Sequence, residues 1–330
     1  MNTKPSTENH FFVAHRDDVW LTFGGLILLK KYSSEKNIVH LLYGLDGYMI
    51  EDFKKKLIKK DPFIITYLRK LSIISGSEIL FKEIIECLNR YNKDDNTFLG
   101  VNVRRLEEKS IAVRNDVILN EYMIPCGYPM RGYKTFNADQ TSIFHDDINQ
   151  QLRLLYDNSC SKSYYNKLKK IAKKNYVDLS DLPSIKDLIN KFDKDKIYNL
   201  FFLSGIGGHP DHIIISKLAY IIKEKFGDKL NVYLGQDLPY ATVSEWFQTS
   251  KVELTSIEKE YICIDSVVKE KFSILRNSYK SQLTAEDVRV IKYYTGSVLK
   301  RLNKDYLQSI DIKYSINKQN IKNIEVLYKL

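Results

Sequence analysis

The hydrophobic pattern of the N-terminal part alternates between short apolar runs and a longer helical segment. Residues 11–14 predict a buried strand, residues 19–31 predict a buried helix, and residues 38–43 predict a second buried strand. A glycine-containing turn follows at residues 44–47. This strand–helix–strand order is typical of the start of a parallel, doubly wound sheet.

The same alternation returns in the C-terminal half. Residues 198–203 and 230–234 predict strands, and residues 211–226 predict the helix between them. Residues 266–303 are largely helical in pattern, and residues 324–330 predict a closing strand.

Two polar, lysine-rich stretches interrupt this alternation, at about residues 51–100 and 130–195, and we interpret them as helical insertions. Residues 104–124 predict one amphipathic helix between them. We therefore expect residues 1–330 to form a single Rossmann-like α/β domain. Its sheet should be mostly parallel and doubly wound, with helices on both faces.

The charge of the chain does not indicate a nucleic-acid-binding protein. The formal net charge is +10, but the lysines are spread along the whole chain and mixed with acidic residues. No zinc-finger spacing or helix-turn-helix signature occurs, so we expect no nucleic-acid partner.

The cysteines and the apolar runs indicate in which cellular compartment the protein is expected. The four cysteines are far apart and form no C-x-x-C pair, which argues against a disulfide framework and against a thiolate zinc site. The first ten residues are polar, and no apolar run approaches the ~20 residues of a transmembrane helix. We expect a cytoplasmic protein with no transmembrane segment; the pattern is silent on its oligomeric state.

A first chemical motif follows the first predicted strand, at His15-Arg16-Asp17-Asp18. In an open α/β sheet, ligands bind beyond the carboxyl ends of the strands. His15 and Asp18 can present a nitrogen and an oxygen to one cation, and Asp17 can reach a water beside it. The simpler alternative is an aspartate helix cap next to a chance histidine.

A second motif, Gly207-Gly208-His209-Pro210-Asp211-His212, also follows a predicted strand and opens a helix. The chain has six histidines, and three of them lie in these two motifs. The alternative of a surface histidine pair beside a helix cap suits one motif better than two at equivalent positions of one sheet. One histidine, one aspartate and a second histidine would leave a metal with an open position, the pattern of catalytic zinc.

Together the motifs resemble the LmbE-like or PIG-L family of zinc-dependent de-N-acetylases. That family has H-P-D-D or H-Q-D-D followed by a Gly-Gly helix, and later H-x-x-H; here Gly24-Gly25 follows the first motif. A late stretch is also similar to the family pattern: Ile264-Asp265-Ser266, Lys271 to Leu275, Ser281-Gln282 and Glu325-Val326. These anchors bracket nearly the whole chain.

The resemblance implies a fold, a cofactor and roles for individual residues. His15, Asp18 and His212 would bind Zn²⁺ or another divalent metal, and Asp17 would be the general base. His209 would stabilise the oxyanion or protonate the leaving amine, and Asp211 would orient a histidine by accepting its other N–H. The implied activity is hydrolysis of an N-acyl group from an amino sugar or sugar conjugate. We expect this acyl group to be acetyl.

Several positions depart from the family pattern. Arg16 replaces the usual Pro or Gln, and it would contact an anionic substrate or pair with Asp46. Val19 stands where the family has Glu, and Arg114-Asn115-Asp116 only loosely resembles the family's R-x-x-E helix.

The stretch that precedes the family's sugar-binding Asp also differs, because here Gly127-Tyr128-Pro129 leads to Met130-Arg131. The candidate substrate contacts are Arg16, Asp46, Tyr128 and Arg131. These departures leave open a non-catalytic carbohydrate- or metabolite-binding protein on the same fold. A nucleotide-binding protein is disfavoured because the first strand-to-helix turn has no G-x-G-x-x-G.

Overall fold

The computed structural model describes most of the chain from residue 6 onward. The residues outside this description are 1–5, 91–95, 128–129, 132–141, 176, 178, 180–181, 183, 243–253, 255–256, 299, 301–311 and 315–320. The strands are β1 (Thr7–Val13), β2 (Lys36–Leu41), β3 (Val117–Glu121), β4 (Ile197–Leu203), β5 (Asn231–Gly235), β6 (Glu258–Cys263), β7 (Ile312–Lys313) and β8 (Ile324–Lys329). The helices are α1 (Asp18–Tyr32), α2 (Glu51–Ile58), α3 (Pro62–Ser75), α4 (Glu78–Asn89), α5 (Asn96–Arg114), α6 (Ser142–Asp157), α7 (Lys162–Lys174), α8 (Ile185–Asn190), α9 (Pro210–Phe226), α11 (Val268–Ser278) and α12 (Ala285–Ser297).

The strands form one mixed sheet in the order β3-β2-β1-β4-β5-β8-β6-β7. The five strands from β3 to β5 run parallel, whereas β8 pairs antiparallel with both β5 and β6. The predicted α/β fold with a mostly parallel, doubly wound sheet is therefore confirmed.

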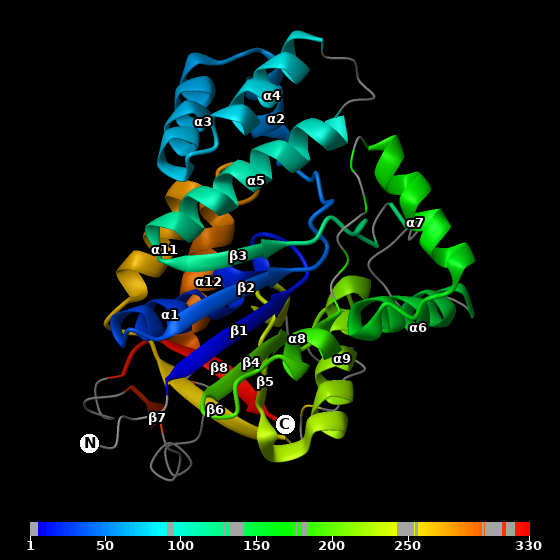
Figure 1. The fold of residues 1–330 in the computed structure, drawn as a ribbon. Coiled ribbons are helices and arrows are strands. Elements are labelled where there is room, and N and C mark those ends of the chain that lie inside the picture. The colour runs from blue at the N-terminus through cyan, green and yellow to red at the C-terminus, as the bar shows by residue number, and fades with distance from the viewer. Residues whose placement is uncertain are drawn as a thin grey trace.

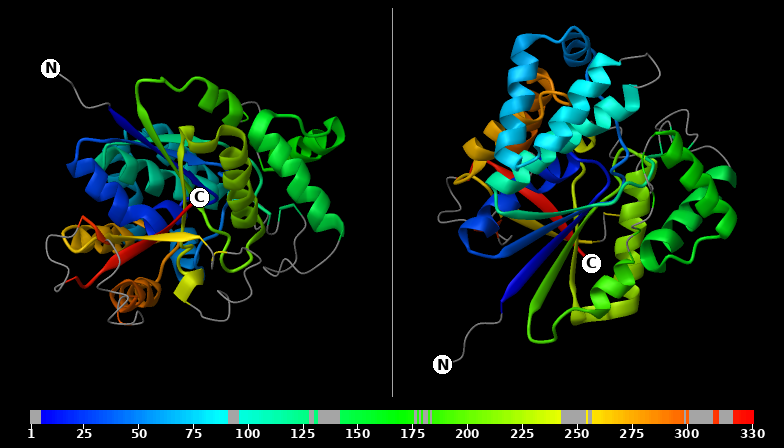
Figure 2. Two further views of the ribbon diagram at one scale, coloured as in Figure 1. Left: turned by 90° about the horizontal axis from the view of Figure 1, so that it is seen from below. Right: turned by 45° about the horizontal axis from the view of Figure 1, so that its top comes forward.

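Helices cover both faces of the sheet (Figures 1 and 2). The crossover through α1 leads from β1 to β2, and the crossover through α9 leads from β4 to β5, in the opposite direction along the sheet. Since such crossovers are right-handed, α1 and α9 lie on opposite faces. Helices α11 and α12 join α1, and α6 and α8 join α9.

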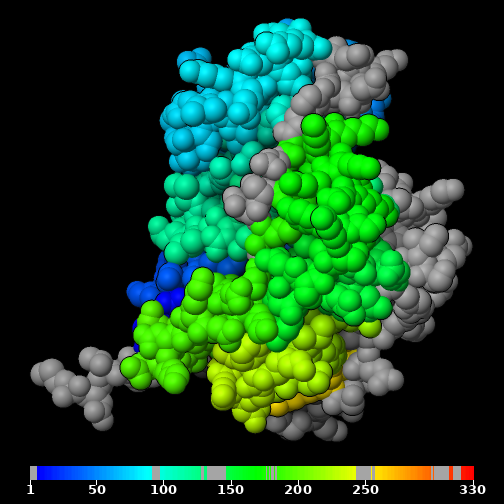
Figure 3. All heavy atoms as spheres, turned by 45° about the vertical axis from the view of Figure 1, so that its right-hand side comes forward, coloured from blue at the N-terminus to red at the C-terminus, as the bar shows by residue number. Residues whose placement is uncertain are grey.

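The first insertion forms a helical layer at one end of the molecule, drawn in blue to cyan at the top of Figure 1. It consists of α2, α3, α4 and part of α5, and its apolar side chains form a core of their own. That core contains Met49, Phe53, Leu57, Leu68, Leu71, Leu80, Ile84, Leu88, Leu99, Val103 and Leu106. The second insertion contributes α6 and α7, drawn in green beside this layer in Figure 3.

One expectation about secondary structure needs correction, and strand β6 was not predicted. Residues 104–124 do not form one helix, because α5 ends at Arg114 and β3 begins at Val117. Asp116 adopts a positive φ of 55°, which a helix cannot continue through. The polar pattern also hid strand β6, which pairs with β8 inside the sheet.

A buried ion pair fastens the C-terminal part of the chain to α1. The Nζ atom of Lys271 lies 2.7 Å from Glu325 and donates to the Leu21 carbonyl, and Glu325 accepts the N–H groups of Gly25 and Leu26. Gly25 permits this approach, because an added Cβ would lie 2.7 Å from the Glu325 oxygen. The absence of a side chain at Gly25 thus lets Glu325 reach the backbone of α1.

Among the described residues, no helix is long and apolar enough to span a membrane.

We predict that Lys271→Met destabilises the protein strongly. Breaking a buried ion pair from one side leaves an unpaired charge, which costs about 3–5 kcal/mol of unfolding free energy. Urea unfolding of the variant measures this loss. The control is Lys56→Met, which removes an exposed pair with Asp52 and should leave the midpoint unchanged. Equal midpoints for Lys271→Met and wild type would contradict the assigned role.

Candidate metal centre

The two sequence motifs meet at the carboxyl ends of β1 and β4. These strands are neighbours, and the chain leaves them in opposite directions, β1 toward β2 and β4 toward β5. The crevice at such a reversal is where open α/β sheets bind ligands. His15 follows β1 and His212 follows β4, so the fold brings both to this crevice.

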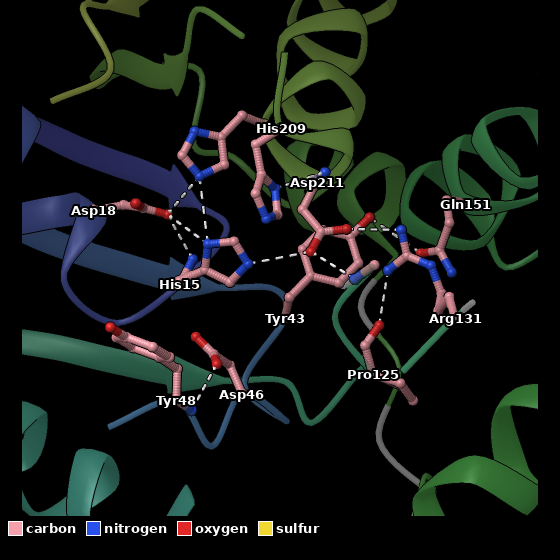
Figure 4. A network of polar contacts seen from close by, with 12 residues as sticks. His15, Asp18, Tyr43, Asp46, Tyr48, Pro125, Arg131, Gln151, His209 and Asp211 are labelled. Atoms are coloured by element: carbon pink, nitrogen blue, oxygen red, sulfur yellow. Dashed lines mark hydrogen bonds and ion pairs between the residues drawn. The ribbon is translucent and has the colours of Figure 1, made fainter. Parts of the chain in front are cut away.

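Three buried side-chain atoms face one another there, and Figure 4 shows His15 and Asp18 with their neighbours. The distance from His15 Nδ1 to Asp18 Oδ2 is 3.4 Å, from His212 Nε2 to Asp18 Oδ2 3.2 Å, and from His212 Nε2 to His15 Nδ1 3.3 Å. Tetrahedral zinc with bonds of about 2.0–2.1 Å places its ligands about 3.3–3.4 Å apart. The three atoms therefore already have the spacing of three ligands around one zinc-sized ion.

The electrostatics of this cluster favour a positive charge. Burial alone would lower the pKa of His15, but Asp18 and Asp211 hold this pKa well above its usual value. Burial would likewise raise the pKa of Asp18, but His212 and His15 hold it well below its usual range. The carboxylates around His15 thus favour a positive charge at this position, and the two histidines favour the ionised form of Asp18.

A network of polar contacts orients His15 from behind (Figure 4). Asp211 is fully buried and lies 3.1 Å from His15 Nε2, which leaves Nδ1 directed at the cluster. Asp211 also accepts from Arg131 at 2.7 Å and from the Gly127 N–H at 2.9 Å. Although burial would raise the pKa of Asp211, Arg131 and His15 keep it far below its usual value. Asp211 therefore stays ionised and can hold the proton of the ring.

The other candidate ligand histidine, His212, also has a carboxylate next to it. His212 Nδ1 lies 3.7 Å from Asp237, at the end of β5. The Asp237 side chain accepts from the Ser204 N–H and hydroxyl and from the Ile206 N–H, and burial raises its pKa to about 7. Sequence reasoning missed Asp237, because nothing in its local pattern distinguishes it from a turn residue.

His209 lies close to the cluster but in a different hydrogen-bonding role. Ligand atoms of His15, His209 and His212 lie within 4.8 Å of one another, so these three form a second candidate ligand set. However, His209 caps α9, and its Nδ1 accepts the Asp211 N–H at 3.2 Å. A neutral imidazole that accepts at Nδ1 carries its proton on Nε2, where it cannot bind a metal. We therefore favour Asp18 as the third ligand.

Asp17 is held by an arginine that the sequence analysis did not single out. Arg104 of α5 is buried and donates to Asp17 at 2.8 Å, and it also contacts Asp46 and Gln282. Burial raises the pKa of Asp17 and the Arg104 charge opposes this, with a net rise. Arg104 thus fixes the position of Asp17 beside the proposed ligands.

Two of the candidate substrate contacts, Arg16 and Arg131, need revision. Arg16 is fully buried and donates to the Gly44 carbonyl and to Glu121 at 3.3 Å, so it neither faces the crevice nor pairs with Asp46. Arg131 is occupied by Asp211 and by Asp147, at 2.7 and 3.1 Å.

Tyr128, another candidate contact, lies outside the described residues. Asp46 remains, because it lines the pocket at the crevice.

The R-x-x-E pattern expected near residue 114 occurs earlier in the same helix. Arg104 and Glu107 are three positions apart on α5 and point to the site. Glu107 accepts from the Ser281 hydroxyl and from Gln282. A search for the pattern along the whole of residues 96–114, rather than at its end, would have found both.

A pocket of 580 Å³ opens over this cluster. Its lining combines the carboxylates and histidines with apolar and aromatic side chains. The lining residues are His15, Asp17, Asp18, Leu21, Asp46, Tyr48, Ile50, Arg104, Cys126, His209, Pro239, Tyr240, Gln282, Leu283, Thr284 and Asp287. Such a pocket can take a small molecule with both polar and apolar parts.

Comparison of sequences finds little. The chain matches no protein-family model. A 7-carboxy-7-deazaguanine synthase of Methanocaldococcus jannaschii is 25% identical over 173 residues, which cover 52% of this chain and 63% of that protein. The similarity thus spans less than two thirds of the curated relative.

Comparison of structures supports the fold. A triple mutant of a deacetylase involved in teicoplanin biosynthesis has a TM-score of 0.51 and 15% identity to this chain, covering 98% of it and 97% of the mutant. A deacetylase–teicoplanin complex from that pathway has a TM-score of 0.51, 14% identity and the same two coverages. At such low identity, these similarities show that the α/β fold is shared along nearly the full length.

We predict that the protein binds one divalent ion and that Asp18→Ala removes it. Loss of a residue that only hydrogen-bonds a metal ligand typically weakens metal binding about 10–100-fold, and loss of a ligand itself should weaken it more. His209→Ala should keep the ion, since that ring is not a ligand in the favoured set. Metal analysis after gel filtration in zinc measures the stoichiometry. Zinc loss in His209→Ala, with retention in Asp18→Ala, would support the other set of ligands.

Proposed function

We propose that the chain is a metal-dependent hydrolase of the LmbE or PIG-L type, which removes an N-acyl group such as acetyl from an amino sugar or sugar conjugate. The observation that carries the proposal is the spacing of His15, Asp18 and His212, at 3.2 to 3.4 Å from one another. The shared fold with deacetylases of the teicoplanin pathway supports it. Zinc is the proposed ion, because two imidazoles and one carboxylate are ligands it favours in catalytic sites.

A divalent ion bound at these residues would polarise a carbonyl oxygen and lower the pKa of water. Asp17 lies next to the proposed ligand Asp18 and lines the same pocket, which supports assigning it the role of accepting a proton from water. Arg104 holds its carboxylate through a 2.8 Å hydrogen bond. Asp17 would then return this proton to the leaving amine.

His209 is suited to hold charge on the carbonyl oxygen. Its Nδ1 accepts from the helix backbone, so the proton of the ring is on Nε2, and the residue lines the pocket. Burial and the neighbouring His15 keep the pKa of His209 well below its usual value, so the ring stays neutral. We therefore assign it the role of a neutral hydrogen-bond donor rather than of a proton source.

Recognition of the sugar would fall to polar groups around the reacting amide. Asp46 and Gln282 both line the pocket, and Arg104 connects them. A carboxylate, an amide and a guanidinium can together accept from and donate to sugar hydroxyls. This arrangement suits a neutral amino sugar at the reacting end of the substrate.

Incubating zinc-loaded protein with a panel of N-acetylated sugars and sugar conjugates, and detecting free acetate, tests the proposal. Release of acetate together with the free amine is expected for at least one substrate. The alternative is a binding protein on the same fold. It would bind sugars from the panel without releasing acetate at full zinc occupancy.

We predict that Asp17→Asn retains the metal and loses about 10²–10⁴-fold in turnover, since an amide cannot accept the proton. His212→Ala should lose both metal and activity. Turnover number and metal content of each variant are the measurements. The matched control is Asp116→Asn, an exposed aspartate at the end of α5, which should behave as wild type. Full activity of Asp17→Asn would show that another group is the base.

A further inference from the structure

A tyrosine from outside both motifs reaches the candidate site. Tyr240 begins a single 3-10 turn, Tyr240–Thr242, a few residues after β5. Its ring lines the same pocket as His15, Asp18 and His209. Nothing in the two histidine motifs or in the resemblance assigns this residue a role.

The Tyr240 ring packs against Gly207, in the loop that carries the second motif. Gly207 has a φ of +87°, and a Cβ added to it would lie 2.6 to 2.8 Å from the Cβ, Cγ and Cδ1 atoms of Tyr240. Contacts that short are not tolerated, so the absence of a side chain at position 207 makes room for the aromatic ring. The ring then packs edge-on against His212, with centroids 5.4 Å apart and an interplanar angle of 85°.

Burial and nearby carboxylates affect the pKa of the Tyr240 hydroxyl. Burial raises the pKa of Tyr240, and the next largest contributions come from Asp18, Asp17 and Asp237. Tyr240 lines the pocket together with two of these carboxylates, Asp17 and Asp18. It stays protonated at neutral pH and can act as a hydrogen-bond donor there.

We propose that the Tyr240 hydroxyl donates a hydrogen bond to the carbonyl oxygen of the bound acyl group, beside the Nε2–H of His209. This assignment rests on the proposed function for the identity of the bond that is cleaved. Two donors from different loops, one after β4 and one after β5, would enclose the oxygen on which charge develops. Donors fixed before the reaction stabilise this charge without reorganising, which is the principle of an oxyanion hole. No bond to Tyr240 forms or breaks.

Tyr240→Phe tests the hydroxyl alone, because the phenyl ring preserves the packing on Gly207 and His212. With zinc content and melting temperature unchanged, turnover should fall about 10²-fold while KM changes by less than about threefold. The matched control is Tyr233→Phe, a buried tyrosine of β5 that stacks on Phe201 and should retain wild-type turnover. Wild-type turnover in Tyr240→Phe would overturn the proposal.

Binding of acetate to the zinc-loaded protein provides a readout that does not depend on turnover. Acetate presents a negatively charged oxygen like the one that develops in the reaction, so calorimetric titration should give about tenfold weaker binding to Tyr240→Phe than to wild type. Equal affinities would refute the role of Tyr240 even if no hydrolysed substrate is found. Failure of the proposed function would give a different result: the wild-type protein would release no acetate from any sugar.

Discussion

The pairing of β1 with β4 is the constraint on which the candidate site depends. Parallel neighbours end at the same edge of a sheet, and here the chain leaves them in opposite directions, so no crossover covers the crevice between them. His15 and His212 are 197 positions apart in sequence and share one spot because of this pairing. Helices α1 and α9 both begin there, and their amino ends favour the carboxylates of Asp18 and Asp211.

The need to pair buried charges explains why arginines surround this crevice. Asp18 and Asp211 lie out of water, which is tolerated only when such charges are paired. Arg131 neutralises Asp211 from behind, and Arg104 does the same for Asp17. At the centre, Asp18 has only His15 and His212 to face it among the contacts of the described residues. A divalent ion would complete this balance, and the arginines would then hold the surrounding groups in place.

The parts of the fold that could be predicted are those whose local pattern matches their environment. Strands β4 and β5 and most of α9 have apolar residues at their buried positions, so the hydrophobic pattern revealed them. The start of β1 escaped notice because Asn9 and His10 are buried by pairing with polar partners from distant segments. Strand β3 escaped because the change from helix to strand at Asp116 is a backbone turn that leaves little trace in hydrophobicity.

The sequence by itself determined the α/β alternation and the order of the two histidine motifs. It also specified the chemical types of the proposed ligands, because strand ends and helix starts are local features. Only the tertiary structure decided which arginine faces the pocket, Arg104 rather than Arg16, and which nitrogen of His209 carries the proton. It also brought Asp237 and Tyr240 to the site from the segment after β5. These outcomes depend on contacts between segments far apart in the chain, and local periodicity contains no information about where such side chains point.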